Sequence, residues 1–406
     1  MVVACTAGGA AADEEWFDRL QERLTWSVLN DRLRARVSGL ADVESYWFEN
    51  PPPGLIFADE SPLLNPRLTV YLDLQAGPRW YGFVQARADR GFDPSEDKGD
   101  VRLDEYAVRF TPWQDGRFHM QVGQFGTVVG SWVKRHSSWD NPFITAPLAY
   151  EQLTGMWDSE AVRTADLLLR WAHLLPATAT EYGDKHLRLP LIWGPSYATG
   201  VAVSGKAGPF EYAAEVKNGS LSSRPEYWSI TRVGLEHPTV SGRVGYRPNE
   251  MWDFGLSGSS GSYLDPSARG TEWGGMGLND YKEKVVGVDV SFAWHYLQVW
   301  AEAFHGTFEI PWVSDVELVS YFIEAKYKLT PQLFLSLRWN EQKYGDLTDS
   351  ANRRVPWGRD TWKIDVAPTY RLTPHTQLKI QYSLQREAAR RDAVTHFLAG
   401  QATMRF

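Results

Sequence analysis

The chain has 406 residues, a formal net charge of −8 and a single cysteine, Cys5. One cysteine excludes an internal disulfide framework, and the acidic balance, with no basic cluster interleaved with aromatic residues, argues against a nucleic-acid-binding protein. The sequence contains no run of 18 or more apolar residues, which excludes a helix that spans a membrane.

The first twelve residues have features of an export signal. Val2-Val3-Ala4-Cys5 resembles the lipobox of bacterial lipoproteins, and Ala10-Ala11-Ala12 resembles a signal-peptidase cleavage site. Because no basic segment precedes either one, we interpret residues 1–12 as the remnant of a longer export signal that is removed near Ala12. Lipidation of Cys5 is the alternative.

A short helix is predicted next, over residues 13–30, which we expect to lie in the periplasm. Its apolar residues follow one another at intervals of three and four, as on one face of a helix: Trp16, Phe17, Leu20, Leu24 and Val28. Two interpretations stay open, since the helix could pack against the rest of the fold or form a coiled-coil seam between protomers.

The remainder, residues 31–406, reads as strand after strand with period-two alternation. Arg32, Arg34 and Arg36 alternate with Leu33, Ala35 and Val37 at its start. The connections are alternately short and long, and the short ones are Gln75–Pro78, Trp113–Gly116, Lys206–Pro209, Arg247–Glu250, Ala293–Tyr296, Leu329–Gln332 and Leu372–His375. This asymmetry is typical of an antiparallel transmembrane β-barrel with periplasmic turns and external loops, here of about 16 strands. A water-soluble sandwich of sheets is the alternative.

Aromatic residues gather beside the short turns. The chain contains 19 Trp and 18 Tyr. Those near the turns are Trp80, Trp113, Phe210, Tyr246, Trp252, Trp294, Tyr296, Tyr327 and Tyr370. Amphipathic rings favour the headgroup region of a bilayer, so we interpret these residues as an aromatic girdle.

The connection after the fifth strand, Gly126–Pro195, is far longer than the others. It is rich in Trp and other apolar residues, which must be buried somewhere. We expect this loop to fold into the lumen and narrow it. The polar residues expected to border the resulting constriction are Lys134, Arg135, His136, Asp140, Asp158, Glu160 and Arg163. An external lid with a helix near Glu160–Leu175 is the alternative.

This arrangement resembles the bacterial porins, in which the third external loop folds inward. The segment Val101–Phe110, followed by Gly116–Phe125, resembles a strand–turn–strand unit of phosphate-selective and related substrate-selective porins. Phe406 resembles the C-terminal aromatic residue that the barrel-assembly machinery reads. The resemblance implies a protein of the Gram-negative outer membrane, with a homotrimer as a possible assembly. No lysine cluster supports phosphate selectivity.

The predicted function is passive diffusion of small hydrophilic solutes, and selectivity would depend on the pore radius and the charges lining it. The residues expected to line the channel are Arg32, Arg34, Arg36, Arg67, Asp73, Arg87, Glu105, Arg109, Arg117, His119, Lys363, Asp365 and Lys379. Their mixed charge, slightly basic, suggests a weak preference for anions or a polar substrate such as a sugar. The alternative is a plugged barrel with a structural or assembly role in an envelope complex.

No catalytic role, metal or cofactor is predicted. The sequence has no phosphate-binding Gly-Lys-Ser/Thr loop, no His-Glu-x-x-His and no Gly-x-Ser-x-Gly. If the chain were nevertheless a barrel hydrolase using Ser and His, His119 and His295 would be the first candidates.

Overall fold

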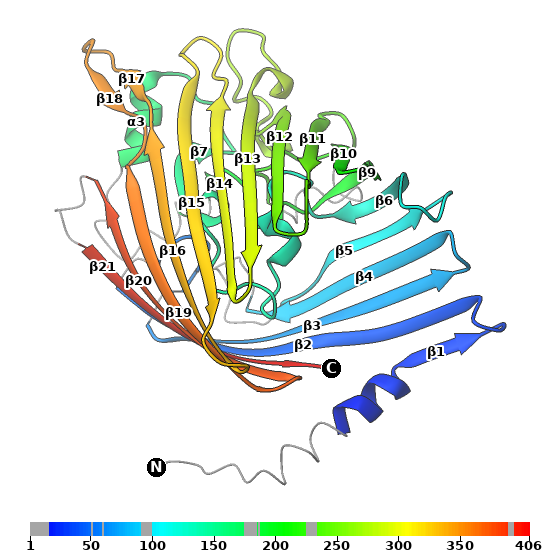
Figure 1. Ribbon diagram of the computed structural model, residues 1–406. Helices are drawn as coiled ribbons and strands as arrows, with labels where there is room; N and C mark the ends of the chain where they lie inside the picture. Colours follow the sequence, from blue (N-terminus) through cyan, green and yellow to red (C-terminus); the bar gives the residue numbers. More distant parts are fainter. Residues whose placement is uncertain are drawn as a thin grey trace.

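The fold is a closed antiparallel β-barrel (Figure 1). The computed structural model describes residues 16–49, 52–58, 61–90, 100–173, 185, 187–224, 234–388 and 394–406. Residues 1–12, with Cys5 and the expected cleavage site, lie outside this part. Among the described residues, no helix combines the length and the apolar character needed to cross a bilayer.

Sixteen strands form the wall. They are β2 Leu33–Phe48, β3 Leu63–Ala76, β4 Trp80–Asp89, β5 Asp100–Phe110, β6 His119–Phe125, β9 Ala198–Ala207, β10 Phe210–Lys217, β11 Thr239–Tyr246, β12 Trp252–Ser262, β13 Lys282–Trp294, β14 Leu297–Phe308, β15 Val316–Lys328, β16 Leu333–Tyr344, β19 Thr361–Thr373, β20 Thr376–Glu387 and β21 Val394–Arg405. Each pairs with the next in this order, and β21 pairs with β2 to close the barrel. The predicted sixteen-stranded barrel is confirmed.

All seven predicted short turns join consecutive strands at the same end of the barrel, which we call the turn end; the opposite end is the loop end. In Figure 1 the turn between β13 and β14 marks the turn end, at the bottom. Positive φ values at Gly77 (59°), Gly208 (60°) and His295 (51°) allow the chain to reverse within a few residues.

The outer surface of the wall is apolar and its inner surface is largely polar. On β13, Val286 and Val288 point outward and are more than half exposed, whereas Glu283 and Asp289 point inward and are buried. The same alternation recurs in the other strands. A soluble sandwich would bury its apolar faces, so that interpretation is wrong, and the exposed apolar belt matches a barrel that sits in lipid.

The predicted aromatic girdle is present at the turn end. All nine of the residues named for it are at least 36% exposed, for example Trp80 at 51% and Trp294 at 56%. Several of them pack on a neighbouring ring, as Phe210 does on Tyr246, with 5.1 Å between ring centroids.

The N-terminal helix is shorter than predicted. It covers residues 16–23 of the described chain and is followed by a strand, β1 Thr25–Val28. Leu29, Asn30 and Asp31 have φ values between 53° and 63°, and this reverses the chain. The prediction of helix up to Asn30 is therefore wrong, because a tight turn lets β1 pair with β2 instead.

This pairing covers an edge that the barrel would otherwise leave open. β21 pairs only with Leu40–Phe48 of β2, and β1 pairs with Leu33–Arg36 of the same strand. Near this junction Phe17 stacks on His375 with ring centroids 5.0 Å apart. The helix therefore packs at the turn end of the barrel, as one of the two interpretations expected.

Candidate channel and constriction loop

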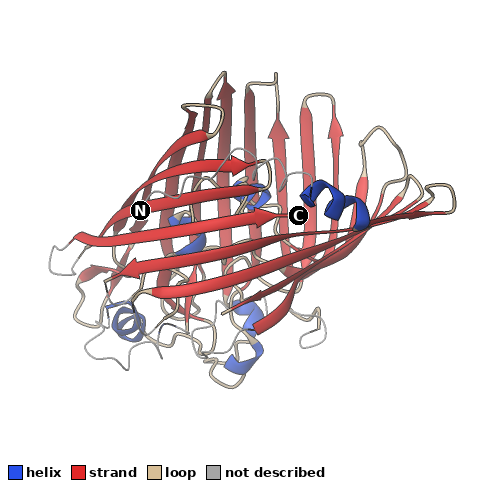
Figure 2. Cartoon of the chain, turned by 90° about the horizontal axis from the view of Figure 1, so that it is seen from below, coloured by secondary structure: helices blue, strands red, loops and turns tan. Residues whose placement is uncertain are grey.

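The connection after β6 folds into the barrel, as predicted. Its elements are η1 Trp132–Arg135, α2 Leu148–Glu151, β7 Leu153–Trp157, α3 Ala165–His173 and β8 Arg188–Pro190. In Figure 2 several short helices appear behind and between the strands of the wall. Its first part, residues 126–151, makes hydrogen bonds to inward-facing side chains of many strands, which places it inside the lumen.

One anchor of the loop is Glu302, an inward residue of β14 that is 2% exposed. Its carboxylate accepts hydrogen bonds from the backbone N–H groups of Ser131 (3.0 Å) and Trp132 (2.6 Å) and from the Ser131 hydroxyl (2.6 Å). The hydroxyl of Tyr150 donates a further one. A single carboxylate thus holds the start of η1 and one residue of α2 against the wall.

A second anchor lies on β16, β19 and β20. Arg338 pairs with Asp365 at 2.8 Å and donates to the carbonyl of Thr145 in the loop. Lys363 Nζ contacts Glu151 Oε1 of α2 at 2.7 Å. Lys379 Nζ donates to the carbonyl of Asn141 at 2.6 Å.

These contacts correct part of the predicted channel lining. Lys363, Asp365 and Lys379 face inward as their strand positions imply, but they are 1%, 0% and 2% exposed. The infolded loop covers them, so they hold the loop and do not meet a water-filled lumen in this structure. The sequence alone does not distinguish the two roles, since both require an inward-facing polar side chain.

Apolar contacts reinforce the anchors on β13 to β15. Phe304, Phe308 and Phe322 point inward and are at most 1% exposed. They join the buried core formed by Trp132 and Tyr150 of the loop together with residues of the external connections. Burying this surface favours the infolded position by the hydrophobic effect.

The second part of the loop lies at the loop end and contacts other external connections. Asp158 pairs with Arg224 at 3.4 Å, and Arg163 donates to the carbonyl of Thr271 at 3.0 Å. Burial raises the pKa of Asp158 to about 7. Asp158, Arg163 and the half-buried Glu160 between them therefore do not join the Arg135 and His136 region, which corrects their predicted place at the constriction. The loop is infolded at its start and covers the barrel further on, where α3 forms the helix expected of a lid.

The wall formed by β3, β4 and β5 stays accessible to water. Side chains of Arg67, Arg87 and Arg102 point inward and are 16%, 13% and 22% exposed. Arg67 pairs with Asp42 at 3.2 Å and with Glu44 at 2.5 Å. These inward groups lie at the depth of the loop, because Asp42 also accepts a hydrogen bond from the Ser138 hydroxyl (2.9 Å).

A β-bulge shapes this wall. The register between β4 and β5 shifts after Gln85, which pairs with Glu105 while Ala86 pairs with Leu103. Asp104 is the extra residue, so Asp104 and Glu105 both turn inward. Asp104 pairs with Arg87 at 3.1 Å and with Arg102 at 2.8 Å.

Strict alternation would place Arg102 and Asp104 on the lipid side, so neither is among the predicted lining residues. The signal that could have revealed them is the pair of adjacent acids, since neither would be stable against lipid. Glu105, which was predicted to line the channel, instead accepts a hydrogen bond from the N–H of Gly126 at 2.8 Å.

His136 is the loop residue that faces the β3–β5 wall. Its Nδ1–H donates to the carbonyl of Val133 (2.6 Å), which leaves Nε2 as the acceptor for the Tyr197 hydroxyl (2.8 Å). Burial is the main cause that lowers the pKa of His136, and Arg87 lowers it further. The ring is therefore neutral at pH 7, in agreement with this hydrogen-bond pattern.

The other residues expected at the constriction have different surroundings. Arg135 pairs with Glu324 on β15, and its guanidinium lies 4.5 Å from the centroid of the Trp300 ring. Lys134 and Asp140 are exposed on the loop surface. The constriction region therefore has cationic groups on the loop and ion-paired arginines on the wall.

Most other predicted lining residues lie toward the turn end. Arg34 and Arg36 are exposed, and Asp73 accepts from the Tyr81 hydroxyl. Arg109 donates twice to Gln121 Oε1, at 3.0 and 2.8 Å.

Three other predicted lining residues are Arg32, Arg117 and His119. Arg32 and Arg117 lie in turns, before β2 and before β6, and are exposed there, so their assignment to strands is wrong. His119 faces inward, and its Nδ1 is 2.8 Å from Thr111 Oγ1. This is a threonine partner and not the serine that a hydrolase of the kind considered would need.

Comparisons with known proteins agree with this architecture. No protein-family model and no curated protein matches the sequence. Among solved structures, the chain is similar to the outer membrane channel DcaP of Acinetobacter baumannii, with 11% identity, a TM-score of 0.56, and 94% of this chain and 99% of that chain covered. It is also similar to an anion-selective porin from Comamonas acidovorans, with 10% identity, a TM-score of 0.55, and 92% and 100% covered. A third is Salmonella typhi OmpF in complex with daunomycin, with 10% identity, a TM-score of 0.57, and 94% and 100% covered. At these identities the likeness concerns the fold, and the chain has the fold of outer-membrane porins.

Proposed function

We propose that this protein is an outer-membrane porin that lets small hydrophilic solutes diffuse passively across the membrane, and that it is not an enzyme. The turn end would face the periplasm and the loop end the outside, the usual orientation of such barrels. Solutes would pass between the infolded loop and the β3–β5 wall.

The observation that carries this proposal is the unequal exposure of the inward-facing charges. Lys363, Asp365 and Lys379 on β19 and β20 are at most 2% exposed beneath the loop, whereas Arg67 on β3 and Arg102 on β5 are 16% and 22% exposed. Side chains that point into a barrel can meet water only inside it. A hydrated space beside the β3–β5 wall accounts for the difference.

The charge of this wall bears on the solute. Three guanidinium groups are ion-paired with four carboxylates there, those of Asp42, Glu44, Asp89 and Asp104. Opposite charges at such short range largely cancel at a distance. We therefore infer weak charge discrimination at this level, which suits sugars and other small polar molecules as well as ions.

A plugged barrel with a structural or assembly role is the second candidate. The observation that favours it is the buried apolar core of the loop and external connections, which extends from Val129 to Trp357. Such a core could close the loop end altogether.

Conductance in planar bilayers separates the two candidates. The porin should give ion-conducting steps, and replacing Arg87 and Arg102 together with glutamine should shift its permeability ratio toward cations. The matched control is Lys282→Gln with Lys284→Gln, two outward lysines of β13. A well-folded wild-type protein without conductance would support the plugged barrel.

The C-terminal residue Phe406 bears on how the barrel is assembled into the outer membrane. The backbone of Phe406 pairs with Gly39 of β2, with N–O distances of 3.0 and 3.1 Å, so it lies at the closing seam of the barrel. We propose that this residue is read by the barrel-assembly machinery, and that the protein forms a homotrimer. Phe406→Ala should reduce the amount of folded barrel in the outer membrane, and cross-linking should reveal the oligomeric state.

A further inference from the structure

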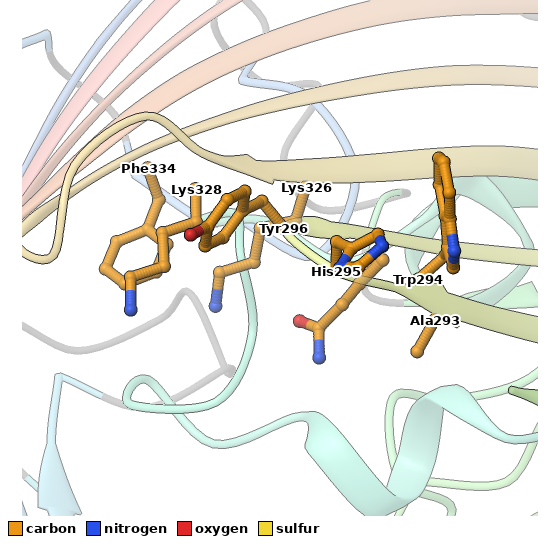
Figure 3. Close-up of a pocket in the computed structure, with 8 residues that line it drawn as sticks. Ala293, Trp294, His295, Tyr296, Lys326, Lys328 and Phe334 are labelled. Atoms are coloured by element: carbon orange, nitrogen blue, oxygen red, sulfur yellow. The ribbon is translucent and has the colours of Figure 1, made fainter. Parts of the chain in front are cut away.

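A cluster of basic and aromatic side chains lines a pocket at the turn end. Its volume is about 260 Å³. The residues around it are Ala293, Trp294, His295, Tyr296, Gln298, Lys326, Lys328 and Phe334. In Figure 3 the side chains of Lys326 and Lys328 extend in the same direction, beside Tyr296 and Phe334.

The two lysines face the interior of the barrel. Lys326 and Lys328 are two residues apart on β15, so they lie on the same face of the strand, about 7 Å apart along it. Lys326 is paired in register with the inward Gln298 of β14, and Lys328 with the inward Phe334 of β16. Both ammonium groups can therefore approach one small molecule in the lumen.

The pocket continues into a row of alternating cations and rings. Lys326 Nζ lies 4.7 Å from the centroid of the Phe334 ring, and the Arg371 guanidinium lies 5.2 Å from it. Arg371 is also 5.2 Å from the ring of Trp139 in the loop, and Arg405 is 4.3 Å from that ring. Four cations from β15, β19 and β21 thus lie on one side of the turn-end lumen.

This cluster lacks the counter-charges found for most inward cations of the barrel. Within the described chain, no carboxylate oxygen lies within 4.0 Å of a side-chain nitrogen of Lys326, Lys328, Arg371 or Arg405, whereas Arg67, Arg243 and Arg338 each have such a partner. Glu324, an acid near Lys326, is engaged by Arg135 and Arg338. The remaining acid, Asp140, accepts from the Ser137 hydroxyl.

One donor of the row is also unused. Arg371 Nε is buried and has no hydrogen-bond partner among the described residues. A buried donor without a partner costs free energy, and so do like charges held close together. An anion in the pocket would relieve the repulsion between these cations.

We propose that this pocket binds a small water-borne oxyanion, a carboxylate or a phosphate, with Lys326 and Lys328 as its charge partners. Gln298 would donate a hydrogen bond, and Phe334 would pack on an apolar part of an organic anion. The site deepens the proposed function, because it would concentrate anions at the turn-end mouth. It depends on that function only for the route by which the anion arrives.

Isothermal titration calorimetry on the full-length protein in detergent tests the site directly, with inorganic phosphate and succinate as separate probes. We expect saturable binding of at least one anion, weakened at least tenfold in Lys326→Gln with Lys328→Gln. The matched control, Lys282→Gln with Lys284→Gln, removes two lysines at the same spacing from the outer face of β13 and should bind as wild type does. Absence of saturable binding in the wild type, or an equal loss in the control, would overturn the proposal.

Two further measurements identify the source of the anion and separate the site from the channel. In nanodiscs, the affinity for phosphate or succinate should be the same in phosphatidylcholine and in phosphatidylglycerol. Loss of this binding in the anionic lipid would mean that a lipid headgroup occupies the pocket, and would overturn the proposal that its ligand comes from water. Calorimetry detects binding whether or not the barrel conducts ions. Anion binding without conductance would therefore contradict only the proposed porin function, and conductance without anion binding would contradict only the proposed anion site.

Discussion

Replacing Glu302 with alanine should release the start of the infolded loop from the barrel wall. The buried carboxylate accepts four hydrogen bonds, from two backbone N–H groups and from the hydroxyls of Ser131 and Tyr150. A hydrogen bond to a charged group contributes about 1.5–3 kcal/mol, and an unsatisfied buried donor is costly. Because four donors share one carboxylate, their contributions are not additive, and we expect a total loss of about 3–5 kcal/mol for the loop's attachment.

The barrel itself should survive this change. β14 keeps its backbone pairing with β13 and β15 over its whole length. Single-channel conductance should therefore rise and become noisier, while the folded barrel still resists denaturation by SDS without heating. Glu302→Gln keeps one acceptor oxygen and should give an intermediate result. Glu317→Ala, which removes an outward carboxylate that is 62% exposed on β15, is the control and should conduct as wild type does.

Unchanged conductance in Glu302→Ala would refute the proposed role of this carboxylate in holding a loop that narrows the lumen. If Glu302→Ala is folded and its conductance matches that of the wild type, either the loop does not narrow the lumen or Glu302 does not hold it. Proteolysis of the loop distinguishes these two explanations, because a released loop is cut faster than an anchored one.

Three further changes test the wall. Val366→Arg, on the lipid face of β19, should cost about 2–4 kcal/mol near the bilayer midplane, measured by urea unfolding from liposomes; unchanged stability would contradict the membrane-embedded barrel. Lys363→Met leaves the Glu151 carboxylate without its 2.7 Å partner and should destabilise the protein by about 3–5 kcal/mol, measured as a lower thermal midpoint. If only the ion selectivity changed, Lys363 would be a channel-lining residue and not an anchor of the loop. A cysteine at Arg36 should react with a charged thiol reagent in intact membranes and one at Val43 should not, and equal labelling would refute the strand register.

The wall of the barrel could be predicted from the sequence because one physical constraint acts along its whole length. Where a strand crosses the lipid, its outward residues are mostly apolar, so the alternation recurs in the strands from β2 to β21. The predicted turn Leu372–His375 coincides with the end of β19 at Thr373 and the start of β20 at Thr376, and the predicted turn Ala293–Tyr296 with the end of β13 at Trp294 and the start of β14 at Leu297. The short turns add independent boundaries at one end.

The bulge in β5 shows where alternation fails. A single extra residue, Asp104, changes which of its neighbours face inward, and period-two reasoning then assigns Arg102 to the wrong side. Side-chain contacts compensate for the disrupted ladder, since Gln124 donates to the carbonyls of Leu103 and Asp104 at 3.2 and 3.1 Å. That compensation links residues about 20 positions apart in the sequence, and no local pattern contains it.

The distinction between lining and anchoring charges also depends on distant contacts. Lys363 and Arg87 are both inward cations of barrel strands, and their local sequence gives no reason to treat them differently. Lys363 is buried because Glu151, 212 residues earlier, lies against it. Arg87 stays partly exposed, at 13%, and pairs with Asp89 and Asp104 on neighbouring strand positions.

The position of the hydrated space follows from the apolar residues that face inward. Exposing Phe304, Phe308 and Phe322 to water would destabilise the protein, so one arc of the wall requires a cover. The Trp-rich loop supplies that cover, and its anchors at Glu302 and Lys363 satisfy the polar groups nearby. The opposite arc needs no cover, since its charges are already paired with one another. Under the proposed function, water would therefore keep access where the wall is most polar, and the side chains that select a solute would be those the loop does not need for its own attachment.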